Sequence, residues 1–115
     1  MENVKKTSVG MDENIEAALS YFLGFLTGIL FFVLEKENKF VRFHAMQSIV
    51  VFIALFVINM VLGIILSMSI VGLMLFPLIY LIEMILWIFL MYKAYKGEKY
   101  MLPTIGDIAE KQAQQ

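Results

Sequence analysis

The sequence lacks the residues on which many enzymes and metal sites depend. It has no cysteine and a single histidine among 115 residues, which excludes disulfides, thiolate ligands and cysteine nucleophiles and argues against a metal cluster. The net charge of -1 gives no reason to expect nucleic acid as a partner. No set of residues forms a recognisable catalytic site. We therefore predict a protein that is not an enzyme and that holds no metal or other cofactor.

Charge is absent from the longest part of the chain. Between Ala45 and Tyr92, only Glu83 is acidic or basic, and hydrophobic residues make up 61% of the whole sequence. Soluble domains contain about 45–50% apolar residues, whereas a membrane span needs about 20 of them in succession. An earlier apolar run is followed by Glu35 and lacks a cleavage site, so we interpret it as a retained span. The predicted spans cover about residues 17–34, 45–66 and 70–92.

The predicted fold is an all-α integral membrane protein that sits in the lipid bilayer. Only Ser67-Met68-Ser69 separates the second and third spans, so we expect these two to form an antiparallel hairpin. Pro77 should bend the third span, because it has no backbone N–H to donate. The predicted parts are a mobile N-terminal tail (1–15), a three-helix transmembrane domain (16–100) and a short C-terminal tail (101–115). A surface helix is one interpretation of the C-terminal tail.

Lysine and arginine are unevenly distributed about the three predicted spans. The N-terminal side of the membrane, which also holds the 67–69 turn, has Lys5 and Lys6. The other side has seven basic residues: Lys36, Lys39, Arg42, Lys93, Lys96, Lys99 and Lys111. The positive-inside rule then places the C-terminus in the cytoplasm and the N-terminus outside the cell membrane.

A few small or polar residues stand out within the predicted spans. Gly24 and Gly28 form a GxxxG pattern, which packs either on the protein's own hairpin or in a seam between copies. Glu83 has the same predicted depth as Gly24, so we expect it to pack over the face that Gly24 shares with Thr27. Glu83 is either a structural hydrogen-bonding group or part of an ion, proton or partner path. Asn59 is predicted to hydrogen-bond between helices, and a direct pair with Glu83 would require tilt or a bridging water.

A polar cluster opens the second predicted span. His44, Gln47 and Ser48 have the i, i+3, i+4 spacing of one helix face, and Arg42 lies just before them. One interpretation is a partner contact or a vestibule that responds to pH through His44. The other is a hydrated helix entrance that holds Arg42 against lipid phosphates.

Two segments resemble a known family. Phe40-Val41-Arg42-Phe43-His44-Ala45-Met46-Gln47-Ser48 opens the second span, and Ala94-Tyr95-Lys96-Gly97-Glu98-Lys99-Tyr100-Met101-Leu102-Pro103 follows the third. Together they resemble a family of small prokaryotic membrane proteins of unknown function, which is distantly similar to the twenty-kilodalton Tic subunit of the chloroplast inner-envelope import channel. The plastid proteins are usually drawn with four spans, where this chain has three predicted ones. The resemblance implies a shared cytoplasmic surface at the family-type positions Arg42, His44, Gln47, Gly97, Glu98 and Pro103.

Two functions fit these observations. The first is a non-enzymatic accessory or scaffold subunit that associates with itself or with another membrane protein through the Gly24/Gly28 face and the cytoplasmic polar cluster. The second is an oligomeric channel or transporter for ions, protons or polypeptide, with Glu83, Asn59 and Thr27 along its path. Substitution of Glu83 by glutamine should distinguish them, because a scaffold tolerates the loss of charge and a charge-dependent path does not.

Overall fold

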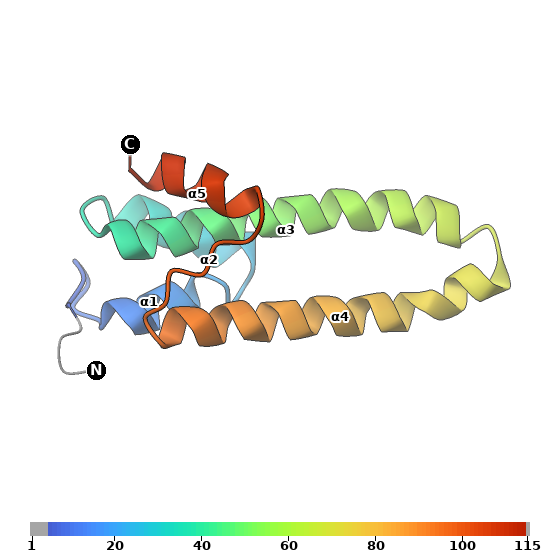
Figure 1. The fold of residues 1–115 in the computed structure, drawn as a ribbon, viewed down its shortest axis with the longest axis horizontal. Helices are drawn as coiled ribbons and strands as arrows, with labels where there is room; N and C mark the ends of the chain where they lie inside the picture. Colours follow the sequence, from blue (N-terminus) through green and yellow to red (C-terminus); the bar gives the residue numbers. More distant parts are fainter. Residues whose placement is uncertain (1–4, 115) are drawn as a thin grey trace.

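A computed structural model describes residues 5–114, which form five α-helices and no strand within that range. The helices are α1 (Glu13–Leu19), α2 (Phe25–Leu34), α3 (Lys39–Leu66), α4 (Ile70–Tyr95) and α5 (Ile105–Ala113). Figure 1 shows α3 and α4 as a long antiparallel pair, with α1, α2 and α5 gathered around one end. We call that end the base and the opposite end, at the 67–69 turn, the tip. The all-helical prediction is therefore confirmed for the described residues.

The two long helices are apolar and largely uncovered. In the most apolar stretch of each, the mean hydropathy is 3.1 for α3 and 2.4 for α4, and only 6% of the stretch is buried. By length and composition both could cross a membrane, and α2, with 10 residues, is a shorter apolar helix. Exposed side chains include Ile64 (70%) and Met74 (72%). Soluble proteins rarely leave so continuous an apolar surface exposed, so this part of the molecule requires an apolar environment.

Ser69 caps the start of α4, and Pro77 lies in the part of the helix that bends. The hydroxyl of Ser69 accepts a hydrogen bond from the N–H of Gly72 at 3.0 Å, which caps the first turn. Pro77 lies inside the helix, and the ribbon in Figure 1 bends in the first third of α4. The short turn and the inclined start of α4 fix how the two long helices lie against each other.

The first apolar segment is not the single helix over 17–34 that the sequence predicts. The chain turns between α1 and α2, where Gly24 has φ 67°, a left-handed conformation that favours glycine. The hydroxyl of Thr27 donates to the carbonyl of Ser20 at 3.0 Å and accepts from the N–H of Leu23 at 3.1 Å. These bonds satisfy backbone groups that a continuous helix would have paired internally.

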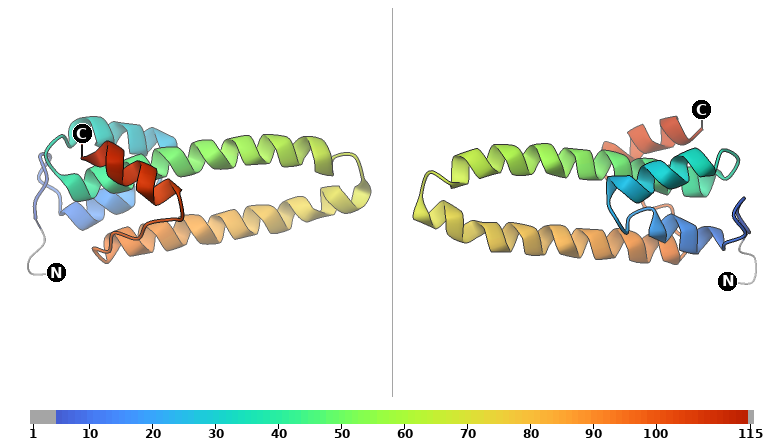
Figure 2. Two further views of the ribbon diagram at one scale, coloured as in Figure 1. Left: turned by 45° about the horizontal axis from the view of Figure 1, so that its top comes forward. Right: turned by 180° about the vertical axis from the view of Figure 1, so that it is seen from behind.

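Instead, α1 and α2 form a helical hairpin that enters the molecule from the base and returns to it. The amide of Asn38, after α2, donates to the carboxylate of Glu13, at the start of α1, at 3.1 Å. Figure 2 shows the two helices beside the base half of α3 and α4. The ten residues of α2 span about 15 Å, half of the ~30 Å hydrocarbon core. We call this unit the re-entrant hairpin.

The re-entrant hairpin changes where the ends of the chain lie. Residues 5–12 and α5 are both at the base in Figure 1, whereas the sequence analysis places the two ends on opposite sides. That prediction counted an odd number of crossings because it took residues 17–34 as one span. With the reversal at Gly24, the described ends of the chain lie at the same end of the molecule.

Residues 5–12 form a compact turn, which we call the N-terminal turn, within the segment predicted as a mobile tail. The N–H of Thr7 donates to the carbonyl of Met11 at 2.8 Å, and Lys6 forms an ion pair with Asp12. Residues 1–4 of the predicted tail lie outside the described residues. The turn covers the open ends of the re-entrant hairpin at the base.

The buried core is confined to the base. Its main cluster joins α1, α3 and α4 and the turn after α1, and it contains Ala17, Tyr21, Val41, Val51, Leu90 and Ala94. On the other side of α3, α5 covers Phe43 with Ala109 and Ala113. A Cβ atom on Gly28 would lie 2.8 Å from the carbonyl oxygen of Ala45, so α2 packs closely on α3. Within one chain, Gly28 of the GxxxG pattern packs on α3, and Gly24 lies in the turn after α1 near the ring of Phe52.

Candidate functional site

A buried polar network occupies the base where the re-entrant hairpin, α3 and residues 97–104 meet. The side chains of Tyr21, His44 and Gln47 are fully buried. His44 Nε2 lies 2.9 Å from the carbonyl oxygen of Glu98, and Nδ1 lies 2.7 Å from the hydroxyl of Tyr21. Because a carbonyl can only accept, Nε2 carries the hydrogen and Nδ1 accepts from Tyr21, which describes a neutral imidazole.

Gln47 completes this base network. Its Nε2 donates to the hydroxyl oxygen of Tyr21 at 3.0 Å and to the carbonyl of Tyr100 at 2.9 Å. Its Oε1 accepts from the N–H of Leu102 at 3.1 Å. We call residues 97–104, which lie across α3 here, the strap. The network satisfies backbone groups of the strap and fastens it to α3.

Arg42 is also an internal connector. Its Nη1 donates to the carbonyl of Phe32 at 2.9 Å, and its Nε donates to the carbonyl of Ala113 at 3.2 Å. The guanidinium carbon lies 3.9 Å from the centroid of the Phe32 ring, a cation–π distance. Arg42 thus joins α2 to α5, whereas the sequence analysis offered lipid phosphates as its partner.

The second family motif shapes the strap. Gly97 has φ 81°, and a Cβ atom there would lie 2.9 Å from the side-chain nitrogen of Asn14. The carboxylate of Glu98 pairs with Lys93 at 3.1 Å, while its carbonyl accepts from the base network. The carbonyl of Pro103 accepts from the N–H of Ile105 at 2.7 Å, where α5 begins.

The two family motifs therefore bind each other. His44 and Gln47 from the first motif hold the backbone of the strap, which belongs to the second. Of the family-type positions, Arg42, His44 and Gln47 are buried, and the strap covers the face on which His44 and Gln47 lie. Gly97, Glu98 and Pro103 are exposed. The helical spacing of His44 and Gln47 is visible in the sequence, but the segment that covers them is some fifty residues away.

A groove of about 550 Å³ lies between α3 and α4, next to the turn that joins α1 to α2. We call it the α3–α4 groove. Its apolar lining comes from both long helices and from the turn after α1, and includes Phe22, Gly24, Phe52, Phe56, Tyr80 and Trp87. The amide of Asn59 donates to the carboxylate of Glu83 at 3.1 Å inside it. Both side chains are half-buried, so this polar pair faces the open groove.

The predicted partner of Glu83 is different from the one in the structure. From the sequence, Glu83 is expected over the Gly24/Thr27 face, and a direct pair with Asn59 is expected to require tilt or a bridging water. In the structure, Gly24 lines the same groove, Thr27 is used in the turn of the re-entrant hairpin, and Asn59 binds Glu83 directly.

Among residues 5–114, no three histidine, aspartate or glutamate side chains come together as metal ligands would. Glu83 pairs with an amide, and His44 is used by the base network. This part of the chain places a polar pair in an apolar groove.

A pair of long, exposed apolar helices above a buried polar base defines a helical membrane protein. The chain belongs to the magnetosome magnetite crystal formation protein family, which matches residues 12–109. A UPF0132 membrane protein of Methanocaldococcus jannaschii is 58% identical over 95% of this chain and 96% of its own length. One of Archaeoglobus fulgidus is 47% identical, over 89% and 96%. A second from M. jannaschii is 43% identical, over 94% and 75%.

No solved structure matches the chain. The names of the three relatives identify membrane proteins and state no activity. None of them concerns the chloroplast import channel, so the resemblance to the Tic subunit supports no conclusion about function.

Proposed function

We propose that the chain is a non-enzymatic membrane scaffold that associates with further copies of itself through the α3–α4 groove. In this proposal α3 and α4 cross the bilayer as a hairpin, and the re-entrant hairpin penetrates about halfway from the base. All nine lysines and arginines lie at the base end of the chain. By the positive-inside rule the base faces the cytoplasm, so both termini are cytoplasmic.

The observation that carries the proposal is the Asn59–Glu83 pair in the open groove. A charged side chain near the middle of a bilayer costs about 2.5–3.5 kcal/mol on insertion scales, and such residues normally face protein or water. The re-entrant hairpin is too short to cover the pair. A helix from a second copy supplies the missing protein surface, and the aromatic lining gives it an apolar contact.

The other surfaces considered for association are already used within one chain. Gly28 packs on α3, and the polar cluster at the start of α3 holds the strap. Thr27 is bound in the turn after α1, so it does not line a path with Asn59 and Glu83. These contacts support a scaffold over a channel. The family description concerns magnetite crystal formation in magnetosomes, and a scaffold without a catalytic site is compatible with it.

Energy transfer between labelled copies tests the proposal. Because the chain has no cysteine, Met68→Cys at the tip, where the residue is 82% exposed, gives a single labelling site. Donor- and acceptor-labelled proteins are mixed in liposomes at several lipid-to-protein ratios. We expect clear transfer that falls several-fold when Asn59 and Glu83 are both changed to leucine.

The matched control is Ile64→Ala, which alters an exposed α3 residue outside the groove lining. It should leave the transfer unchanged, and Glu83→Gln, which keeps the hydrogen bond, should retain most of it. Absence of transfer in the unmodified protein, or equal loss in Ile64→Ala and the double leucine variant, would contradict association through the groove.

A further inference from the structure

Two carboxyl groups lie buried together beneath the N-terminal turn. Glu16 belongs to α1 and is fully buried, and Glu35, directly after α2, is 1% exposed. They come from the two arms of the re-entrant hairpin and meet at its open end. The sequence shows each only as an acid flanking an apolar run, so their meeting depends on the reversal at Gly24.

The hydrogen bonds of the pair indicate different protonation states for Glu16 and Glu35. Both oxygens of Glu35 accept from Ser8, one from the backbone N–H at 3.0 Å and the other from the hydroxyl at 2.7 Å. Two donors of this kind suit an ionised carboxylate. Glu16 Oε1 accepts from the hydroxyl of Thr7 at 2.5 Å, whereas Glu16 Oε2 is buried without a donor. A proton on Glu16, hydrogen-bonded to Glu35, removes the cost of burying a charged carboxylate with an unpaired oxygen.

The electrostatics agree with one proton held between the two groups. Burial, together with the neighbouring Glu35, raises the pKa of Glu16 to about 7. Burial alone would raise the pKa of Glu35, but hydrogen bonds from Glu16 and Ser8 outweigh it and hold that pKa below its usual value. Because the two groups interact strongly, they titrate as a unit.

Most of the other charged side chains near the pair bind other groups of the protein. Lys6 pairs with Asp12 in the N-terminal turn, and Glu13 accepts from Asn38. Lys39 donates to the carbonyl of Gln114, and Arg42 donates to the backbone carbonyl of Glu35. The remaining charged side chains near this end are Lys5, Lys36 and Glu37, which line the polar pocket beside Glu35.

We propose that the Glu16–Glu35 pair is a proton-operated latch, which fastens the N-terminal turn across the open end of the re-entrant hairpin while it holds one proton and releases the turn when that proton is lost. Two negative charges in a buried site repel each other and need water. Water reaches them when Thr7 and Ser8 move away. The latch is separate from the α3–α4 groove, so it stands whether or not the chain associates with itself.

The direction of the pH dependence follows from the raised pKa. The docked state binds the proton that the released state loses, so docking is strongest in acid and weakens as the pH rises through about 7. The base therefore loosens when the cytoplasm becomes more alkaline. A purely structural pair would keep the turn docked on both sides of neutrality.

A nitroxide label on Val9→Cys reports the state of the turn, because Val9 is 48% exposed and the chain has no other cysteine. The full protein is reconstituted in liposomes with the same pH on both sides. We expect slow label motion at about pH 4.5 and fast motion at about pH 8.5, with a midpoint between the ordinary pKa of 4.5 and the raised pKa of about 7. Absence of a transition in the unmodified protein would overturn the latch.

Variants of the pair separate a latch from a structural contact. Glu16→Gln keeps a donor toward Glu35 without a charge, so the label should stay slow at both pH values. Glu13→Gln, on the same helix, should keep the full response. If Glu16→Gln fails to fold, Glu35→Gln decides: removing the neighbouring charge should move the midpoint at least one pH unit lower. An unchanged midpoint in Glu35→Gln, or a normal response in folded Glu16→Gln, would overturn the latch.

Discussion

Gln47 is the residue on which the base network converges. Its side chain makes three hydrogen bonds, and the groups at their other ends belong to the turn after α1 and to the strap. None of these partners is near Gln47 in the sequence. Gln47 thus links α3, the turn after α1 and the strap. Apolar contacts alone would not fix the relative positions of these three segments.

Replacement of Gln47 by leucine should destabilise the base by about 2–4 kcal/mol, because it leaves buried polar groups of the strap unpaired. Thermal unfolding in detergent measures the loss, and faster trypsin cleavage after Lys99 shows that the strap has been released. Gln112→Leu is the control, since that side chain is exposed on α5. Equal stability of the two variants would show that the network does not hold the strap.

Gly28 and Gly63 provide a matched pair of glycine positions. A Cβ atom on Gly28 would meet the carbonyl of Ala45 at 2.8 Å, whereas one on Gly63 would meet nothing within 4 Å. We expect Gly28→Ala to cost about 1–3 kcal/mol of stability through overpacking. Gly63→Ala should be neutral or stabilising by up to about 1 kcal/mol through helix propensity. The same unfolding assay decides, and a neutral Gly28→Ala would argue against close packing of α2 on α3.

At the scale of elements, the re-entrant hairpin shows the limit of composition as a guide. Residues 17–34 are apolar enough and long enough for a span, and nothing in their average hydropathy reports the reversal at Gly24. The local signals are a glycine able to adopt positive φ and Thr27, whose hydroxyl pairs with the backbone of the turn. The sequence predicts α3 and α4 more reliably, because their apolar runs are long and the 67–69 turn leaves no alternative path.

Single cysteines should report the topology of this hairpin directly. We expect Val9→Cys and Lys111→Cys to react with a membrane-impermeant thiol reagent from the same side of the membrane, because residues 5–12 and α5 both lie at the base. Met68→Cys, at the tip, should react from the other side. Inverted and right-side-out vesicles distinguish the sides. Labelling of Val9→Cys together with Met68→Cys would restore the single span over 17–34.

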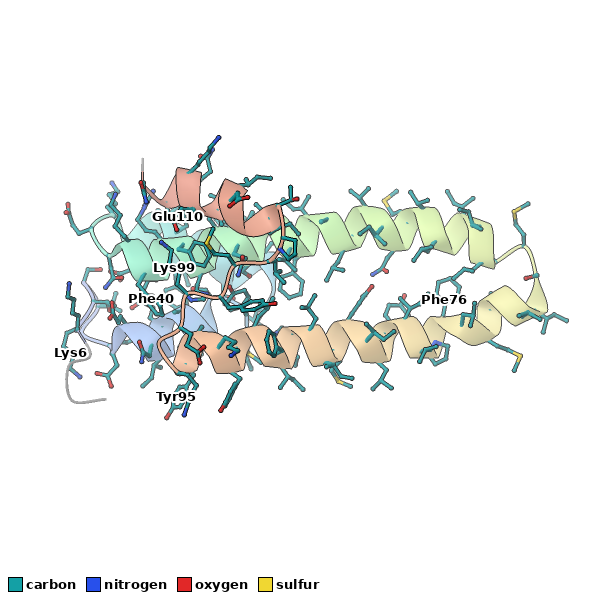
Figure 3. All side chains as sticks on the ribbon, in the orientation of Figure 1. Lys6, Phe40, Phe76, Tyr95, Lys99 and Glu110 are labelled. Atoms are coloured by element: carbon teal, nitrogen blue, oxygen red, sulfur yellow. The ribbon has the colours of Figure 1, made fainter. Side chains whose placement is uncertain are left out.

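At the scale of the whole molecule, polar and apolar surfaces are divided along its length of 52 Å. Figure 3 shows Lys6, Lys99 and Glu110 at the base and Phe76 toward the tip. Lys99 and Glu110 form an ion pair that connects the strap to α5. Hydrogen bonds and ion pairs thus connect the segments of the base around its core. The apolar side chains of the tip half must be covered by something outside the chain.

The shape of a single chain argues against the alternative function as a channel. The α3–α4 groove opens sideways, and the re-entrant hairpin stops about halfway along the long helices, so one chain encloses no path. We expect ion and proton flux in proteoliposomes to equal that of empty liposomes, for the unmodified protein and for Glu83→Gln at the same protein density. Flux that Glu83→Gln abolishes would instead support an oligomeric channel with Glu83 in its path.

The turn at the tip also determines what biosynthesis requires. In the proposed topology, with the base facing the cytoplasm, the segment between α3 and α4 that must be translocated is Ser67-Met68-Ser69, which carries no charge. The two long helices can then insert together as a helical hairpin. The re-entrant hairpin can insert from the cytoplasmic side, where it is synthesised. No charged domain has to cross the membrane. The lysines around the base disfavour translocation of that end of the molecule.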